Sequence, residues 1–161
     1  MTVWLRPNEL QQLVDCHKAA LEIYAAQWCS GAEDCVQEAF LQLVRQRRRP
    51  DRPIAWLFRV VRNIAISHQR SAKRRKHREQ QSVQLSRRID AGDSPLESLA
   101  VGEALAGLDD VLRQVVIAKI WGGLTYHEIA DLLGISASTA HRHFDQALSK
   151  LKIRLGSPCL K

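Results

Sequence analysis

Apolar residues recur at helical spacing along most of the chain, and no segment shows the alternation of a strand. The first stripe predicts a helix that begins at Pro7, with Asn8 as its N-terminal cap and Gln11 as the partner in a capping box. A second helix is expected over about 32–47, after a break and capping box that begin at Ser30. Its core side is expected to bury Val36, Phe40, Leu43 and Val44. The pattern therefore predicts an all-α fold.

The opposite side of the 32–47 helix is polar around a single leucine. It carries Asp34, Gln37, Glu38, Leu41 and Gln42. An acidic face with an apolar centre suits docking onto a basic helical partner.

A third helix is expected to open at Pro53, because proline at the first helical position removes an amide that the helix leaves unbonded anyway. The segment before it, 45–52, is predicted to be a loop, since Pro50 interrupts it. The helix continues as a basic extension to about Arg78. Residues 79–93 have no sustained period, so they predict a flexible linker between two small helical bundles.

After the linker, Ser94 is expected to cap a new helix, and Leu108 and Asp109 to start the next one. Gly122 and Gly123 are expected to end that later helix. It is predicted to place five residues on about one face: Leu112, Val115, Val116, Lys119 and Ile120.

Residues 124–152 have the pattern of a helix-turn-helix. Thr125 and Glu128 have the spacing of a capping box at the first helix. Gly134 can adopt the left-handed conformation at which that helix ends, and Ser136 can cap the second helix. The outward face near the start of the second helix carries the polar residues Ser138, Thr139, His141 and Arg142. His143 is a further candidate for this face. These are expected to reach DNA in the major groove, where an arginine fork can bond guanine.

The net charge of +7 is unevenly distributed. Residues 1–44 carry −4, residues 45–88 carry +13 from fifteen Lys/Arg and two Asp/Glu, and residues 89–161 carry −2. A basic block on both sides of an apolar helix indicates contact with a polyanion, since Lys and Arg displace counterions from phosphates. Aromatic and arginine side chains on the helix that follows the 45–52 loop could hold an unpaired base and its backbone. Trp56, however, could equally belong to the core.

The four cysteines show no CxxC pair and no histidine at zinc-finger spacing, so we expect free thiols, no metal and no cofactor. A redox or metal switch that uses Cys29 and Cys35 is the less favoured alternative, because these residues lack a recognisable ligand spacing. His68 falls on the apolar stripe and is interpreted as a core or edge residue rather than a ligand. No histidine has a catalytic partner at a recognisable spacing, which argues against an enzyme. Without a membrane-length apolar run or a signal-peptide core, we expect a cytoplasmic protein with no membrane insertion.

Three segments in this order resemble bacterial RNA polymerase sigma factors of the extracytoplasmic-function (ECF) class. Region 2.2 of that family is similar to GAEDCVQEAFLQLV, residues 31–44. Regions 2.3 and 2.4 are similar to PIAWLFRVVRNIAISHQRSAKRR, residues 53–75. Region 4 is similar to residues 108–152. The resemblance implies a region 2-like domain at 1–78, the linker, and a region 4-like domain at 94–161.

In that family, region 2.2 binds core RNA polymerase, which the resemblance places on Asp34, Gln37, Glu38 and Leu41. Regions 2.3 and 2.4 open the promoter minus-ten element, which places that role on Arg47, Arg48, Arg49, Arg52, Trp56, Arg59, Arg62 and Asn63. The minus-thirty-five element is assigned to Ser138, Thr139, His141 and Arg142. Expected partners are core polymerase and promoter DNA, with an anti-sigma factor left open. The alternative is a conventional regulator that binds operator DNA through the helix-turn-helix without polymerase.

Overall fold

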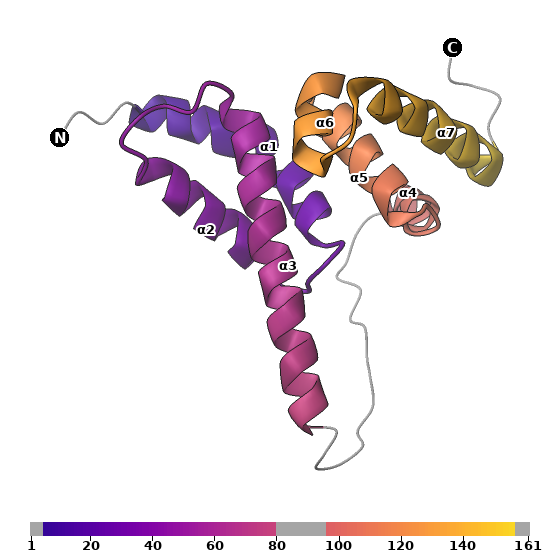
Figure 1. The fold of residues 1–161 in the computed structure, drawn as a ribbon, viewed down its shortest axis with the longest axis horizontal. Helices are drawn as coiled ribbons and strands as arrows, with labels where there is room; N and C mark the ends of the chain where they lie inside the picture. Colours follow the sequence, from indigo (N-terminus) through magenta and orange to yellow (C-terminus); the bar gives the residue numbers. More distant parts are fainter. Residues whose placement is uncertain (1–4, 80–95, 157–161) are drawn as a thin grey trace.

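The computed structural model describes residues 5–79 and 96–156, and every regular element in these ranges is a helix, as predicted (Figure 1). The predicted linker after Glu79 and the predicted cap Ser94 fall outside the described residues. No helix in the two ranges combines the length and the apolar content needed to cross a membrane. The elements are α1 (Pro7–Ala25), α2 (Ala32–Val44), α3 (Pro53–Glu79), α4 (Leu96–Ala106), α5 (Asp110–Val116), the π-helix η1 (Ile117–Trp121), α6 (Tyr126–Leu133) and α7 (Ala137–Leu155).

The N-terminal unit consists of α1, α2 and α3, which pack against one another in pairs. Their apolar stripes meet in a core whose largest fully buried side chains include Leu21, Tyr24, Val36, Leu43, Leu57, Phe58 and Val61. The C-terminal half of α3 projects away from the other helices (Figure 1). Residues 70–78 are exposed there, so the basic extension presents its charges to solvent.

The ends of the first two helices differ from the sequence prediction. Asn8 is not the cap of α1: Pro7 takes the first helical position, and the amide of Arg6 donates to Oε2 of Glu9 at 3.1 Å. Ser30 does not cap α2 either, because Gly31 is the N-cap residue and makes no side-chain cap bond.

The helix predicted to run to residue 47 ends at Val44, and that residue is 43% exposed rather than buried. As the last residue of α2, it lies at the rim of a groove beside α1.

The α5 helix begins where predicted, with Asp109 as its N-cap residue, but its buried face changes after Val116. The chain continues as η1, in which each π-type hydrogen bond spans five residues and adds one residue to the turn. This extra residue rotates the following side chains out of helical register. Ile117 and Ala118 are therefore buried, whereas Ile120 is 50% exposed. The prediction that Ile120 shares one face with the buried Leu112, Val115 and Val116 is wrong.

The helix-turn-helix follows its predicted local signals. The amide of Glu128 donates to the Thr125 hydroxyl at 3.3 Å, and Oε2 of Glu128 accepts from the Thr125 amide at 2.7 Å. Gly134 has φ of 69°, which only glycine adopts cheaply, and Ser136 accepts from the Thr139 amide at 3.1 Å. Each such cap stabilises its helix by about 1 kcal/mol.

The two units are in direct contact, which the sequence did not predict. Gln114 is buried at the contact, where its Oε1 accepts from the Tyr24 hydroxyl and from Nε of Arg62, both at 3.3 Å. A Cβ on Gly122 would lie 2.6 Å from the Phe58 ring, so this close approach requires glycine. The core of the N-terminal unit therefore continues into η1 and α6 of the C-terminal unit.

Candidate nucleic-acid and partner interfaces

The predicted docking face lies on the outside of α2. Asp34 and Gln37 are exposed, Leu41 is 51% exposed, and Glu38 is half-buried, with its Oε1 accepting from Nε2 of Gln42 at 3.1 Å. Beside this face is a mainly apolar groove of about 410 Å³ between α1 and α2. It is lined by Leu10, Val14, Lys18, Val36, Gln37, Phe40, Leu41 and Val44. The arrangement offers a partner an apolar centre bordered by polar and acidic groups.

The loop and α3 residues predicted to bind the minus-ten element fall into two groups. One group is exposed, and the other contacts the C-terminal unit. Exposed are the loop arginines and two residues of α3: Arg47, Arg48, Arg49, Arg59 and Asn63. In the contacting part, Nη1 of Arg52 lies 3.5 Å from Oε1 of Glu128, and Arg62 donates to Gln114. Trp56 is half-buried and shares a pocket of about 350 Å³ with Leu132 of α6.

The carboxyl group of Glu128 connects the helix-turn-helix to this surface. Partial burial by itself would raise its pKa, but hydrogen bonds from the Thr125 amide and hydroxyl, together with the Arg52 guanidinium, hold the pKa below its usual value. Glu128 is therefore ionised at neutral pH, and its charge both caps α6 and attracts an arginine of the predicted DNA surface.

The outward face of α7 is open to solvent. Ser138, His141 and Arg142 are exposed, and Thr139 is half-buried. The His141 ring packs edge-on against Tyr126 at 4.8 Å between centroids, with its Nδ1 3.1 Å from Oδ2 of Asp145. These contacts fix the ring on the helix surface beside Arg142.

His143 is turned differently from the neighbouring face. Its Nδ1 is buried and has no hydrogen-bond partner in the described structure. The residue is therefore a poor candidate for reading DNA.

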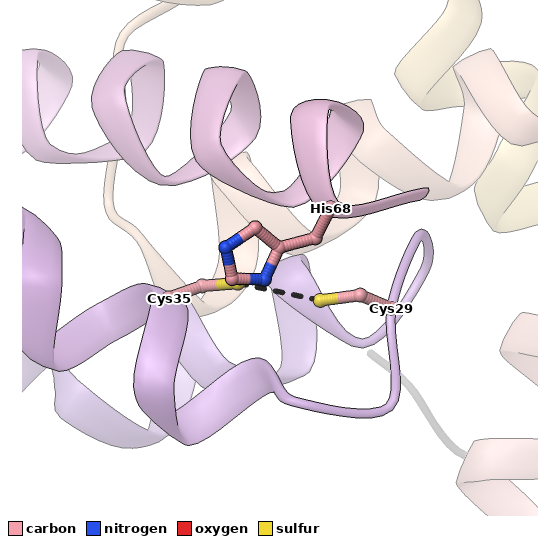
Figure 2. A group of neighbouring side chains, drawn as sticks. All are labelled: Cys29, Cys35 and His68. Carbon is pink, nitrogen blue, oxygen red and sulfur yellow. Dashed lines mark hydrogen bonds between the residues drawn. The ribbon is translucent and has the colours of Figure 1, made fainter. Parts of the chain in front are cut away.

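A cluster whose histidine the sequence did not predict lies where α1, α2 and α3 meet (Figure 2). Its members are Cys29, Cys35 and His68, whose ligand atoms all lie within 4.8 Å of one another. Burial, followed by a hydrogen bond to Cys29, raises the pKa of the Cys35 thiol to about 12. His68 is exposed rather than part of the core, and it lies 33 residues from Cys35, beyond any short motif.

Two family models match the chain. The model for region 2 of sigma-70 matches residues 13–75, and the model for region 4 of sigma-70 matches residues 98–151. The first covers the docking face and the basic surface, and the second covers the helix-turn-helix.

Relatives of the same class match over most of their length. The ECF RNA polymerase sigma factor SigL of Mycobacterium tuberculosis is 31% identical over 158 residues, which is 91% of this chain and 88% of SigL. The ECF sigma factor SigK of Mycobacterium ulcerans is 30% identical over 132 residues, covering 75% of this chain and 70% of SigK.

Two solved structures have a similar fold. The sigma factor RpoE of Bartonella quintana, solved in complex with the anti-sigma factor NepR, matches with a TM-score of 0.68 and 23% identity, covering 96% of this chain and 100% of that one. CnrH, solved in complex with the cytosolic domain of CnrY, matches with a TM-score of 0.61 and 25% identity, covering 96% and 92%.

Proposed function

Because this chain belongs to the ECF class of RNA polymerase sigma factors, it directs RNA polymerase to promoters, and we propose how its surfaces divide that work. Sigma factors are non-catalytic initiation factors, and we extend this to the chain itself, which would act through binding free energy. The division into a polymerase-binding and minus-ten unit at 1–78, a linker at 79–93 and a minus-thirty-five unit at 94–161 is part of the proposal.

Core polymerase would bind the α2 face formed by Asp34, Gln37, Glu38 and Leu41. The observation that carries this assignment is the 51% exposed Leu41, which lines an apolar groove and lies among acidic and amide groups. An apolar anchor surrounded by polar residues is the usual arrangement of an interface hot spot. A regulator that binds operators unaided would have no need for this surface.

The minus-ten element would be bound by the exposed arginine loop and the first half of α3. Arg47, Arg48 and Arg49 would hold phosphates, and Trp56 would offer a stacking surface for an unpaired base. Arg52, Arg59, Arg62 and Asn63 complete the proposed surface. Arg52, Trp56 and Arg62 contact the C-terminal unit in this arrangement, so opening of the contact would accompany promoter melting.

The minus-thirty-five element would be read by the α7 face that carries Ser138, Thr139, His141 and Arg142. This face is at the N-terminal half of the second helix of the motif, where such helices place base-reading side chains. Arg142 is the best placed for a base contact, because it is exposed and its guanidinium can bond a guanine in a bidentate manner.

A partner protein of the anti-sigma class would be a further ligand. The structure of RpoE was solved with such a factor, and that of CnrH with the cytosolic domain of CnrY. The α2 groove, which is apolar and open, is the surface we assign to competition between such a partner and polymerase.

The test combines the chain with purified core polymerase on a library of promoter fragments. We expect defined start sites only when the chain is present, and Glu38→Lys should reduce both co-purification with core and transcription, because it reverses a charge within the docking face. The matched control is Glu103→Lys, which makes the same change on an exposed position of α4. Normal co-purification of the Glu38→Lys variant would contradict the assignment of the α2 face. Protection of duplex DNA by the chain alone, with no effect on core, would instead favour the conventional regulator.

A further inference from the structure

The cluster of Cys29, Cys35 and His68 brings three soft ligands together from separate parts of the chain. Cys29 lies in the connection between α1 and α2, Cys35 in the first turn of α2, and His68 on α3 (Figure 2). The two sulfurs are 3.3 Å apart, and Sγ of Cys35 lies 3.5 Å from Nδ1 of His68. The side chains therefore point at one common position, although the residues come from three segments.

These separations are close to those of a tetrahedral zinc site. With Zn–S bonds of about 2.3 Å and Zn–N bonds of about 2.0 Å, the tetrahedral edges are about 3.8 Å between sulfurs and about 3.5 Å between sulfur and nitrogen. The Cys35–His68 separation already has this value, the sulfur–sulfur separation has to lengthen by about 0.5 Å, and Sγ of Cys29 lies within 4.8 Å of the ligating imidazole nitrogen. Two thiolates and an imidazole select Zn²⁺ over Mg²⁺ or Ca²⁺, which prefer oxygen ligands.

We propose that Cys29, Cys35 and His68 bind one Zn²⁺ ion, with water at the fourth coordination position. A route for the ion exists, because His68 is exposed and also lines an open pocket of about 310 Å³ between α2 and α3. Cys35 is fully buried on the other side, so the site has a closed inner side and an accessible outer side.

A disulfide accounts for the cluster less well. The sulfurs are 3.3 Å apart, whereas a disulfide bond is about 2.05 Å long. A disulfide also leaves the imidazole beside Cys35 without a role, whereas a metal site uses all three groups. A Cys29–Cys35 disulfide is therefore the competing result that the experiment has to distinguish from a metal site.

A metal at this position would join the α1–α2 connection, α2 and α3 to one another. The polymerase face that we propose lies on α2, and the minus-ten residues lie on α3, so the ion would hold these two surfaces in a fixed relation. Because Zn²⁺ would bind the folded chain and not the unfolded one, saturation should raise the melting temperature by roughly 5–10 °C.

The experiment uses the full chain with Cys16→Ser and Cys159→Ser, which leaves Cys29 and Cys35 as the two remaining cysteines of the four. The reduced, chelator-treated protein is titrated with Zn²⁺ by calorimetry and with Co²⁺ as a spectroscopic probe. We expect one ion per chain and a Co²⁺ spectrum with thiolate charge-transfer and tetrahedral ligand-field bands. Cys29→Ser and His68→Gln should each weaken binding at least roughly tenfold and reduce the gain in melting temperature.

The matched control is His77→Gln, an exposed histidine near the end of α3, which should leave binding unchanged. Cys29 and His68 are not fully buried, so their variants should fold, and far-ultraviolet circular dichroism verifies this. Failure to bind either ion would overturn the proposal, as would binding that survives loss of both Cys29 and His68. A Cys29–Cys35 disulfide that forms in air, together with no Co²⁺ spectrum in the reduced protein, would replace the metal site by a redox pair. No polymerase or DNA enters the experiment, so its result is independent of the promoter-binding proposal.

Discussion

The two surfaces proposed for promoter DNA differ in how accessible they are. The α7 face is open, and Arg142 and Ser138 point to solvent on a helix held by its own cap and by contacts within the C-terminal unit. The surface on the N-terminal unit is only partly open, because Arg52, Trp56 and Arg62 meet α5 and α6 of the other unit. Under the proposed function, the first surface would meet duplex DNA as it stands, while Trp56 and Arg62 of the second surface are partly covered.

The difference matches the free-energy demands of the two proposed tasks. Reading duplex DNA requires a rigid helix with exposed side chains, and α7 provides it without rearrangement. Capturing a flipped base requires a surface that single-stranded DNA can enter, and here the same residues also hold the two units together. Under the proposed function, the contact between the units would have to open before single-stranded DNA reaches the covered parts of Trp56 and Arg62.

The largest expected effect concerns the exposed part of the N-terminal surface. Replacing Arg47, Arg48 and Arg49 together by Gln should remove up to three phosphate contacts and reduce the salt dependence of holoenzyme binding to promoter DNA by about 2–3 in log–log slope. The slope is measured by titrating holoenzyme onto a labelled promoter at several salt concentrations. The variant with three Lys residues keeps the charge and should retain most of the slope. An unaltered slope in the Gln variant would show that these arginines touch no phosphate.

The second effect concerns the open surface. Arg142→Ala should weaken holoenzyme binding by about 1–3 kcal/mol and relax discrimination at one base pair of the upstream element, because it removes a bidentate contact. Footprinting and competition with single-base variants of the promoter measure both quantities. Lys152→Ala, ten residues further along the same helix and also exposed, is the control and should change little. If Arg142→Ala leaves the footprint and the base preference unchanged, the residue does not belong to the site.

The sequence predicts the α7 surface better than the other because its determinants are local. The Thr125–Glu128 box, Gly134 and Ser136 each act within three or four residues, so a pattern in the chain suffices. The partial covering of Trp56 depends on contacts between units that are far apart in sequence. No spacing rule encodes those contacts.

The same distinction explains the other differences between prediction and structure. Ile120 was misplaced because a π-helix changes the register, and the periodic pattern assumes a regular α-helix. The approach of His68 to Cys35 depends on how α3 packs against α2, which was predicted only as two separate apolar stripes. Helices and their caps were therefore largely predictable, whereas side chains brought together by tertiary packing were not.

The third effect concerns the contact between the two units that partly covers Trp56 and Arg62. Gln114→Ala removes the acceptor of the buried Tyr24 hydroxyl and the partner of Arg62, which should lower the free energy of unfolding by about 1–3 kcal/mol. Burial keeps the pKa of Tyr24 above its ordinary value, so the hydroxyl remains a proton donor and cannot compensate by ionising. Urea denaturation measures the loss. Binding of the free chain to a mixed-sequence single-stranded oligonucleotide should increase, while binding through the α7 face should not.

The control for this substitution is a double-mutant cycle with Tyr24→Phe, which keeps the ring and removes only the hydroxyl. If Gln114 stabilises the contact through Tyr24, the two substitutions should be less than additive, with a coupling of about 0.5 kcal/mol or more. Additive losses would mean that Gln114 does not act through Tyr24. Single-strand binding that does not change would mean that the contact between the units does not limit access to Trp56 and Arg62. The difference between the two surfaces would then lie in their chemistry alone, because an arginine loop that is already exposed needs no opening to bind phosphates.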